Sequence, residues 1–234
     1  MHYAGQIAKK GLEIKAIKLS PDKPFLWASG FYMPIYNDNR MFLFYPESRK
    51  LIAQGFKHLL TSKEIQYDII AGTSTAGISP ATTLGDLLEA PVIYVRDKPK
   101  SHGLKNQIEG IDAESDLQGK KVILTEDLVS TAGSSVKAVQ GIRNANGDCK
   151  NCLSIFHYGL DVAEKMFNGE EPYNNQGHKL EHPCQINSLL TYDLLLKVAK
   201  ETNYINSADL KMLTNWRKEP FAWGEKHGFP RVNK

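Results

Sequence analysis

Four short apolar runs in the middle of the chain predict buried β-strands. Within each run the apolar residues follow one another instead of alternating with polar ones, which is typical of parallel strands covered by helices on both faces. The runs are residues 67–71, 91–95, 121–124 and 152–158. Residues 78–88 and 134–146 lie between them with helical spacing, and Gly147 ends the second helix. This alternation predicts an α/β fold with a doubly wound, mainly parallel sheet flanked by helices.

The two ends of the chain have different patterns. Residues 2–20 are polar and basic, with Ile7, Leu12 and Ile17 at roughly helical spacing, and predict an N-terminal helix. Residues 21–45 are irregular and rich in aromatic side chains, and Pro46 can open the helix that follows. In the tail, residues 192–200 and 207–218 predict two helices packed on the α/β domain.

Composition and charge exclude several classes of protein. The chain has 234 residues, enough to bury a core without metal or disulfide support. Its 29 Lys and Arg against 26 Asp and Glu are too balanced for binding nucleic acid through bulk charge. No apolar run approaches the roughly 18 residues of a membrane span, and residues 1–16 lack the apolar centre of a signal peptide. We therefore expect a cytoplasmic protein without nucleic-acid or membrane partners.

The three cysteines predict a reducing compartment, because an odd and sparse number suits no disulfide framework. Cys149 and Cys152 have the CxxC spacing, and with His178 and His182 they suggest a zinc site as an alternative. The interval between the two pairs is about twice that of a zinc finger, and a second CxxC is absent. The preferred interpretation is ordinary thiols at the start of a strand, with no metal site built from protein side chains alone.

The loop after the first strand is a short, small-residue turn, and ligands bind beyond the carboxyl ends of such strands. Residues 72–79 read GTSTAGIS, which has the glycine spacing of a Walker A loop, but Ile78 stands where its lysine is required. The chain also contains no GxG, so both a P-loop NTPase and a dinucleotide-binding protein are disfavoured. The loop is either a tight turn alone or a turn whose backbone N–H groups face an anion.

The loop after the third strand combines acids with hydroxyls. Glu126 and Asp127 come at the end of the strand, and the small and hydroxyl residues of 130–134 lead into a helix. Hydroxyls and N-terminal amides suit a phosphate monoester, whereas the acids suit sugar hydroxyls or a metal ion. A ribose 5-phosphate satisfies both halves. The alternative is that the acids are only partners of the helix dipole.

The loop after the second strand is long and basic. Residues 96–110 contain Arg96, Lys98, Lys100, His102 and Lys105, and few large apolar side chains. A charge run of this kind is usually a solvated surface. Beside two anion-binding loops, it is better interpreted as a lid that brings cations to a second, highly charged phosphate.

Three segments resemble a known family. The segment VILTEDLVSTAGSS, residues 122–135, resembles the phosphoribosyl pyrophosphate signature of type I phosphoribosyltransferases, with Ala132 where a glycine is common. The segments RDKPKSHGLKNQIEG, residues 96–110, and FLWASGFYMPIYNDNR, residues 25–40, resemble the lid and the base-site segment of the orotate phosphoribosyltransferase branch. The resemblance extends from about residue 5 to residues 213–224, LTNWRKEPFAWG. It therefore covers nearly the whole chain.

The resemblance implies a site for phosphoribosyl pyrophosphate. Glu126 and Asp127 would hold the ribose hydroxyls, and Arg96 would reach the pyrophosphate with Lys100 and His102. The loop around the 5-phosphate would consist of Leu128, Val129, Ser130, Thr131, Ala132, Gly133 and Ser134. The pyrophosphate loop would consist of Thr73, Ser74, Thr75 and Ala76.

The resemblance also implies the reaction and the organisation of the chain. The activity would be transfer of phosphoribosyl to orotate in pyrimidine synthesis, with Mg²⁺ as cofactor and Asp127, Lys100 and His102 as catalytic residues. The lid would act across the interface of a homodimer. Residues 1–45 would form a helix and a hood over the base, residues 46–190 the α/β core, and residues 191–234 helices packed on that core. A transferase for another base and a non-catalytic phosphoribosyl pyrophosphate sensor are the alternatives.

The departures from the family pattern lie around the base and in the lid. Asp97 stands where a lid lysine is common, Ala28 replaces a frequent lysine, and Tyr158 occupies a position where some members have an orotate-binding arginine. Ser130 would lie near the orotate, and Arg40 is the cation best able to hold its carboxylate. The alternative is that Arg40 pairs with Asp38 or another acid.

Overall fold

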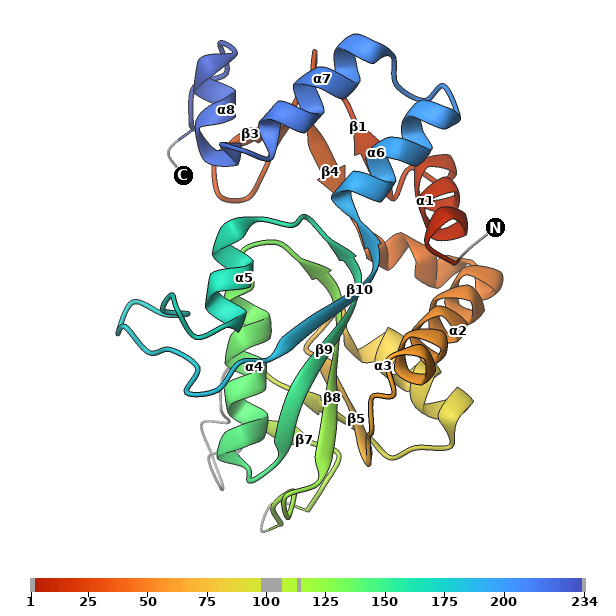
Figure 1. The fold of residues 1–234 in the computed structure, drawn as a ribbon, viewed down its shortest axis with the longest axis vertical. Helices are drawn as coiled ribbons and strands as arrows, with labels where there is room; N and C mark the ends of the chain where they lie inside the picture. Colours follow the sequence, from red (N-terminus) through yellow and green to blue (C-terminus); the bar gives the residue numbers. More distant parts are fainter. Residues whose placement is uncertain (1–2, 98–106, 113–114, 233–234) are drawn as a thin grey trace.

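The computed structural model describes residues 3–97, 107–112 and 115–232, and within them a six-stranded sheet forms the centre of the molecule (Figure 1). Its strands lie in the order β10, β9, β8, β5, β6, β7. Neighbouring strands pair in parallel except β6 and β7, which are antiparallel. The strands are β5 (Ile69–Thr73), β6 (Val92–Val95), β7 (Ile108–Glu109), β8 (Lys121–Val129), β9 (Asp148–His157) and β10 (Gln185–Thr191).

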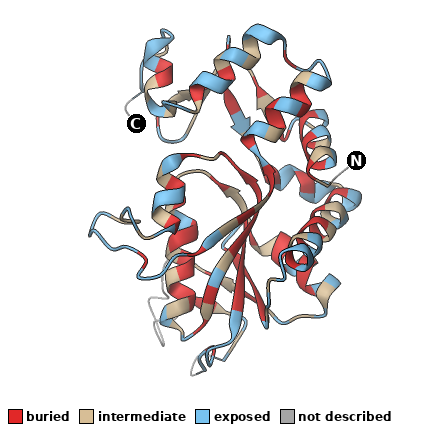
Figure 2. Cartoon of the chain, in the orientation of Figure 1, coloured by how far each residue is buried: buried red, intermediate tan, exposed pale blue. Residues whose placement is uncertain are grey.

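Helices cover both faces of the sheet, as the unbroken apolar strands require. On one face lie α1 (Tyr3–Glu13), α2 (Pro46–Ser62) and α3 (Ile78–Leu88); on the other lie α4 (Gly133–Asn144) and α5 (Asp161–Phe167). Each face has its own apolar cluster. Figure 2 shows the buried residues concentrated in the strands and on the helix faces turned toward them. The predicted doubly wound α/β sheet is confirmed.

A smaller lobe, which we call the hood, stands above the carboxyl ends of the strands (Figure 1). It contains two antiparallel strand pairs, β1 with β4 and β2 with β3, and a 3₁₀ helix η1. The C-terminal helices join it, with α6 against α1 and α8 against β3. The bounds are β1 (Ile17–Leu19), β2 (Phe25–Leu26), β3 (Tyr32–Met33), β4 (Ile35–Asn37), η1 (Asn39–Phe44), α6 (Tyr192–Glu201), α7 (Ser207–Trp216) and α8 (Pro220–Lys226).

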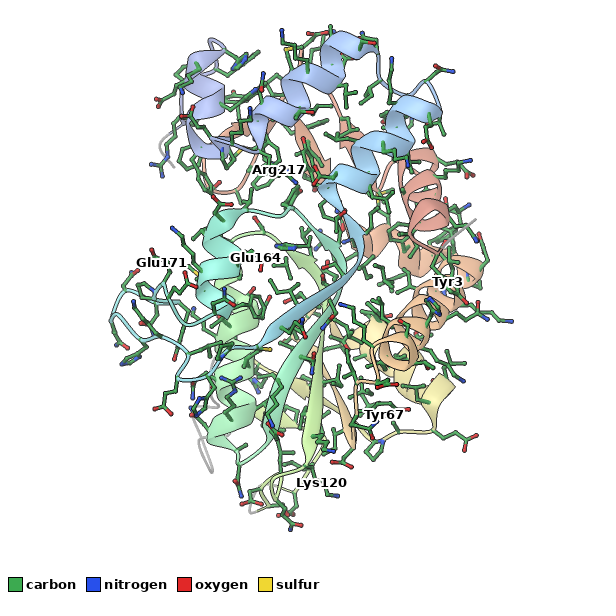
Figure 3. The ribbon with its side chains drawn as sticks, viewed as in Figure 1. Tyr3, Tyr67, Lys120, Glu164, Glu171 and Arg217 are labelled. Carbon is green, nitrogen blue, oxygen red and sulfur yellow. The ribbon has the colours of Figure 1, made fainter. Side chains whose placement is uncertain are left out.

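Aromatic side chains join the hood to the sheet. The ring of Trp216 lies 5.1 Å from that of Tyr192 and 5.7 Å from that of Tyr158, which follows β9. All three tryptophans of the chain, Trp27, Trp216 and Trp223, belong to the hood. Arg217, which is labelled in Figure 3, lies at the end of α7. It forms an ion pair with Asp193 of α6 at 2.7 Å. The hood and the sheet therefore share one apolar core.

The predicted elements differ from the observed ones mainly at their ends. The helix predicted over 78–88 is found residue for residue, whereas the N-terminal helix ends at Glu13 and residues 17–19 form a strand. Lys15 has a φ of 61°, a left-handed conformation that no helix continues through. The third strand runs to Val129 instead of Leu124, because Thr125 and Glu126 are buried although they are polar. Besides the strand at 17–19, the sequence analysis missed β2, β3, β4 and η1 in the segment predicted to be irregular. It also missed β7, α5, β10 and α8.

None of the helices in the described part of the chain is long and apolar enough to cross a membrane. Cys149, Cys152 and Cys184 are all buried and unpaired. Among residues 3–97, 107–112 and 115–232, no group of three His, Cys, Asp or Glu side chains could hold a metal ion.

Candidate active site

A cavity of about 350 Å³ opens at the carboxyl ends of β5, β6 and β8. In the sheet, β5 lies between β6 and β8. The chain passes from β5 to β6 and later returns to β8 on the opposite edge of β5, so the carboxyl ends of these strands mark the point where the strand order reverses. The sequence-predicted residues in its wall are Arg40, Thr73, Ser74, Thr75, Ala76, Arg96, Glu126, Asp127, Leu128 and Ser134. Of the other predicted residues, Lys100 and His102 lie outside the described residues.

The first turn of α4 begins without a side-chain cap. Ala132 is the N-cap residue of this helix and has a φ of 70°. Its side chain makes no capping hydrogen bond. The amides of the first turn therefore point out of the helix without intrahelical partners, at the positive end of the helix dipole. Ser134, in this turn, reaches the wall of the cavity. A glycine would adopt the left-handed backbone of position 132 without strain.

Glu126 is buried in the wall of the cavity, and three donors hold its carboxyl group. Thr73 Oγ1 donates to Oε1 at 2.7 Å, the Asp127 N–H donates to the same oxygen at 3.1 Å, and Ser135 Oγ donates to Oε2 at 2.9 Å. Only 5% of Glu126 is exposed. Burial, followed by the charge of Asp127, raises the pKa of Glu126 to about 8.

Asp127 is only partly buried and lines the cavity. Its carbonyl oxygen accepts a hydrogen bond from Asn39 Nδ2 of η1 at 2.6 Å, so the hood holds the backbone of this acid. Burial raises the pKa of the Asp127 carboxyl. A hydrogen bond between the side chains of Asp127 and Glu126 lowers that pKa and so opposes the shift. The two adjacent acids both line the cavity but have different surroundings: Glu126 is buried with three protein donors on its carboxyl, whereas Asp127 is partly exposed.

Arg40 forms the ion pair that the sequence analysis left as an alternative. Its Nε and Nη2 donate to the two carboxylate oxygens of Asp38 at 2.7 and 2.9 Å. The guanidinium holds the pKa of Asp38 below its usual range. The side chain of Arg40 is still 63% exposed and stands in the cavity wall, so contact with a ligand carboxylate stays a prediction.

A family model described as phosphoribosyl transferase domain matches residues 43–162. The orotate phosphoribosyltransferase of Listeria innocua is 40% identical over 94% of this chain and 98% of its own length. That of Cytophaga hutchinsonii is 40% identical over 95% of this chain and 99% of its own. The chain belongs to the orotate phosphoribosyltransferase family. A crystal structure of a Francisella tularensis member has a similar fold, with a TM-score of 0.67 and 17% identity over 92% of this chain and 98% of that one.

The family signature spans most of β8, the short loop after it and the first turn of α4, and its acids and Ser134 line the cavity. Of the residues that departed from the family pattern, Tyr158 is buried and packs against Trp27, Phe156 and Trp216. Burial raises the pKa of its hydroxyl, and the side chain contributes no cation. Ala28 is exposed in the hood.

The cavity also contains residues that the sequence analysis missed. Lys137 of α4 lies in its wall, with its Nζ 3.9 Å from Asp97. Lys137 follows Ser134 by three residues and therefore lies on the same face of the helix. This spacing could have predicted Lys137 from the sequence. Asn37, Asp38, Val95, Asp97 and Ala138 complete the wall. Arg96 forms an ion pair with Glu109 of β7 at 3.2 Å.

Proposed function

We propose that the protein transfers the 5-phosphoribosyl group of phosphoribosyl pyrophosphate to orotate and releases pyrophosphate. The observation that carries this proposal is the position of Asp127. This acid faces a cavity between the uncapped first turn of α4 and the loop of residues 73–76. A sugar diol, a phosphate monoester and a diphosphate each have a matching wall in that arrangement.

Each part of the substrate is assigned to one wall of the cavity. The 5-phosphate lies on the amides and hydroxyls of residues 128–134, and the ribose hydroxyls donate to Asp127. The diphosphate lies on the backbone of residues 73–76 with Arg96 beside it. The hood wall, with Arg40 and Asn37, then remains for the base.

Mg²⁺ fits this site as an ion held mainly by the substrate. The described residues offer no cluster of three ligating side chains, but Asp127 provides one carboxylate in the cavity wall. Mg²⁺ is commonly bound by one or two carboxylates together with substrate phosphates and water. When bound, the ion neutralises charge on the diphosphate and favours its departure.

The reaction breaks the bond from C1 of the ribose to the diphosphate oxygen and forms a bond from C1 to an orotate ring nitrogen, which gives up its proton to the departing pyrophosphate or to water. C1 gains positive charge as pyrophosphate leaves with negative charge, so fixed charges on both sides lower the barrier. Each cation in the described wall already has an acidic partner: Arg40 with Asp38, Arg96 with Glu109, and Lys137 with Asp97. We assign the additional charge to Lys100 and His102 of the lid.

A homodimer completes the proposal. The helix η1 exposes apolar side chains next to the site: Met41 is 38% exposed, Leu43 40% and Phe44 83%. Exposed apolar groups of this size favour a protein interface. The unpaired cysteines support a cytoplasmic location, because reduced thiols are typical of that compartment.

The deciding experiment follows the loss of orotate absorbance with phosphoribosyl pyrophosphate and Mg²⁺. Parallel reactions contain uracil, hypoxanthine or adenine in place of orotate. We expect turnover with orotate alone. Turnover with another base instead of orotate would show that orotate is not the acceptor. The absence of turnover with every base would contradict the transferase assignment.

A further inference from the structure

The segment after α8, residues 228–232, returns to the turn of the hairpin formed by β2 and β3. The Val232 N–H donates to the carbonyl oxygen of Gly30 in that turn at 2.9 Å. Gly30 has a φ of 84°, and a Cβ atom at this position would lie 2.2 Å from the Val232 carbonyl oxygen. The close approach of the two backbones therefore requires glycine at position 30.

Side chains of the same segment contact the hairpin. The ring of Phe229 lies 5.7 Å from that of Tyr32 in β3, and the Arg231 guanidinium stands 4.4 Å from the centre of the Phe31 ring. A cation over the face of an aromatic ring is attracted to it. Phe229 also stacks on Trp223 of α8, with the two ring planes 7° apart. The segment is thus anchored on α8, which itself lies beside β3 (Figure 1).

The hairpin in turn supports one wall of the cavity. Trp27, just after β2, donates from Nε1 to the carbonyl oxygen of Ile35 in β4 at 2.9 Å. The strand β4 ends at Asn37, which lines the cavity, whereas residues 25–33 and 228–232 lie outside the cavity wall. The position of this wall therefore depends on contacts made outside the cavity.

The end of β4 presents a polar group that protein leaves unsatisfied. Both Oδ1 and Nδ2 of Asn37 are buried and have no hydrogen-bond partner among the described residues. Buried polar atoms of this kind are normally paired. A base whose ring offers a carbonyl oxygen and an N–H satisfies the donor and the acceptor of one amide together. Such a pairing is directional, so the backbone that carries Asn37 must be held in place.

We propose that residues 228–232 are a positioning segment for the base. They hold the β2–β3 hairpin against α8, and through Trp27 they fix the end of β4 where Asn37 meets the base. This inference rests on the proposed function, and the segment itself touches no substrate. The phosphoribosyl half of the cavity is built on β5, β8 and α4. Releasing the segment therefore weakens recognition of the base and leaves recognition of phosphoribosyl pyrophosphate intact.

The first test releases the segment in the full chain. The release variant is Arg231→Ala with Val232→Pro, which removes the cation and the N–H donor. Its matched control, Arg231→Lys with Val232→Ala, keeps both. We expect the release variant to raise the KM for orotate at least about threefold, with kcat and the KM for phosphoribosyl pyrophosphate within about twofold of wild type. No rise, the same rise in the control, or an equal rise in both KM values would overturn the positioning role.

The second test displaces the segment from the side of the hairpin. In Gly30→Ala the new methyl group collides with the Val232 carbonyl oxygen, so the segment must move. Gly177→Ala is the matched control, because Gly177 has a φ of 78° and nothing within 4 Å of a Cβ atom. Gly30→Ala should raise the orotate KM, and Gly177→Ala should not. Added to the release variant, Gly30→Ala should raise that KM by less than about twofold more. A full additional rise would mean that alanine acts on the hairpin directly, and the proposal would be wrong.

The third test needs no substrate and separates this inference from the proposed function. Amide hydrogen exchange is measured in residues 25–37 and in residues 127–135. The release variant should exchange faster than its control in 25–37 and at the same rate in 127–135. A wild-type protein that does not turn over orotate would remove the proposed function, and the exchange result would still stand. Unchanged exchange in 25–37, or an equal increase in both segments, would overturn the positioning role.

Discussion

Glu126 is an acid placed where its charged form is costly, and this should be visible in the stability of the protein. Its pKa in the folded state is about 8, against an ordinary value of 4.5, chiefly because it is buried. Between these values the folded protein keeps a proton that the unfolded chain has lost. The free energy of unfolding therefore falls as the pH rises through this window.

We expect wild type to lose stability relative to Glu126→Gln between about pH 5 and pH 8. The amide cannot ionise, so the difference between the two proteins isolates this one group. Urea unfolding of both proteins at several pH values measures it. A difference that does not change with pH would mean that Glu126 ionises normally in the fold.

Arg40 is expected to exchange Asp38 for the carboxylate of orotate. Arg40→Leu should then raise the KM for orotate at least about 10-fold, equivalent to about 1.4 kcal/mol, with little change in the KM for phosphoribosyl pyrophosphate. The matched variant Asp38→Asn weakens the competing partner and should lower the orotate KM. Steady-state kinetics of both variants provide the check. An unchanged orotate KM in a folded Arg40→Leu protein would leave Arg40 as a purely structural partner of Asp38.

At the level of elements, the start of α4 depends on a left-handed residue that has a side chain. Ala132 has a φ of 70° and is 4% exposed. We expect Ala132→Gly to keep or raise the Tm, because relief of about 1 kcal/mol of backbone strain offsets the greater freedom of glycine in the unfolded chain. Ala132→Val should lower both the Tm and the affinity for inorganic phosphate. Thermal unfolding and phosphate titration measure these effects, and a clear loss of Tm in Ala132→Gly would contradict the strain argument.

The elements that could be predicted from the sequence are those whose pattern of polar and apolar residues follows burial alone. Long apolar strands and the helix of 78–88 were found because burial alone determines their pattern. The strand β10, QINSLLT, was missed because its Asn187 and Ser188 find hydrogen-bond partners inside the sheet, so its polar residues imitate a loop. Burial of a polar residue depends on a partner distant in sequence, and a local pattern does not contain it.

The same reason limited the prediction of the site. Loops after the strands located the cavity, because parallel strands bring their carboxyl ends to one edge. The different surroundings of Glu126 and Asp127 depend on Thr73, Ser135 and Asn39, which come from three other elements. The two acids are adjacent and chemically alike, and only the tertiary structure separates them.

At the level of the whole molecule, the proposed dimer makes a quantitative prediction. If each lid serves the partner's cavity, a hybrid of Lys100→Ala and Asp127→Asn subunits has one intact site. An equal mixture should then recover about a quarter of wild-type activity, since half of the dimers are hybrids with one of two sites working. Phe44→Asp should abolish the recovery by weakening the interface. No recovery after verified subunit exchange would mean that each lid acts within its own chain.

The placement of the tryptophans gives the molecule a built-in optical reporter. Residues 46–190 contain none, so tryptophan fluorescence observes only the hood, whereas far-UV circular dichroism also reports the helices and strands of the core. Trp216 and Trp223 are buried in the same apolar cluster as Ile70 and Leu153 of the sheet. Two lobes that share one core unfold together, so both signals should follow a single denaturation curve. A fluorescence change that precedes the loss of dichroism would reveal a hood that opens while the sheet is intact, and would give a direct way to time that opening.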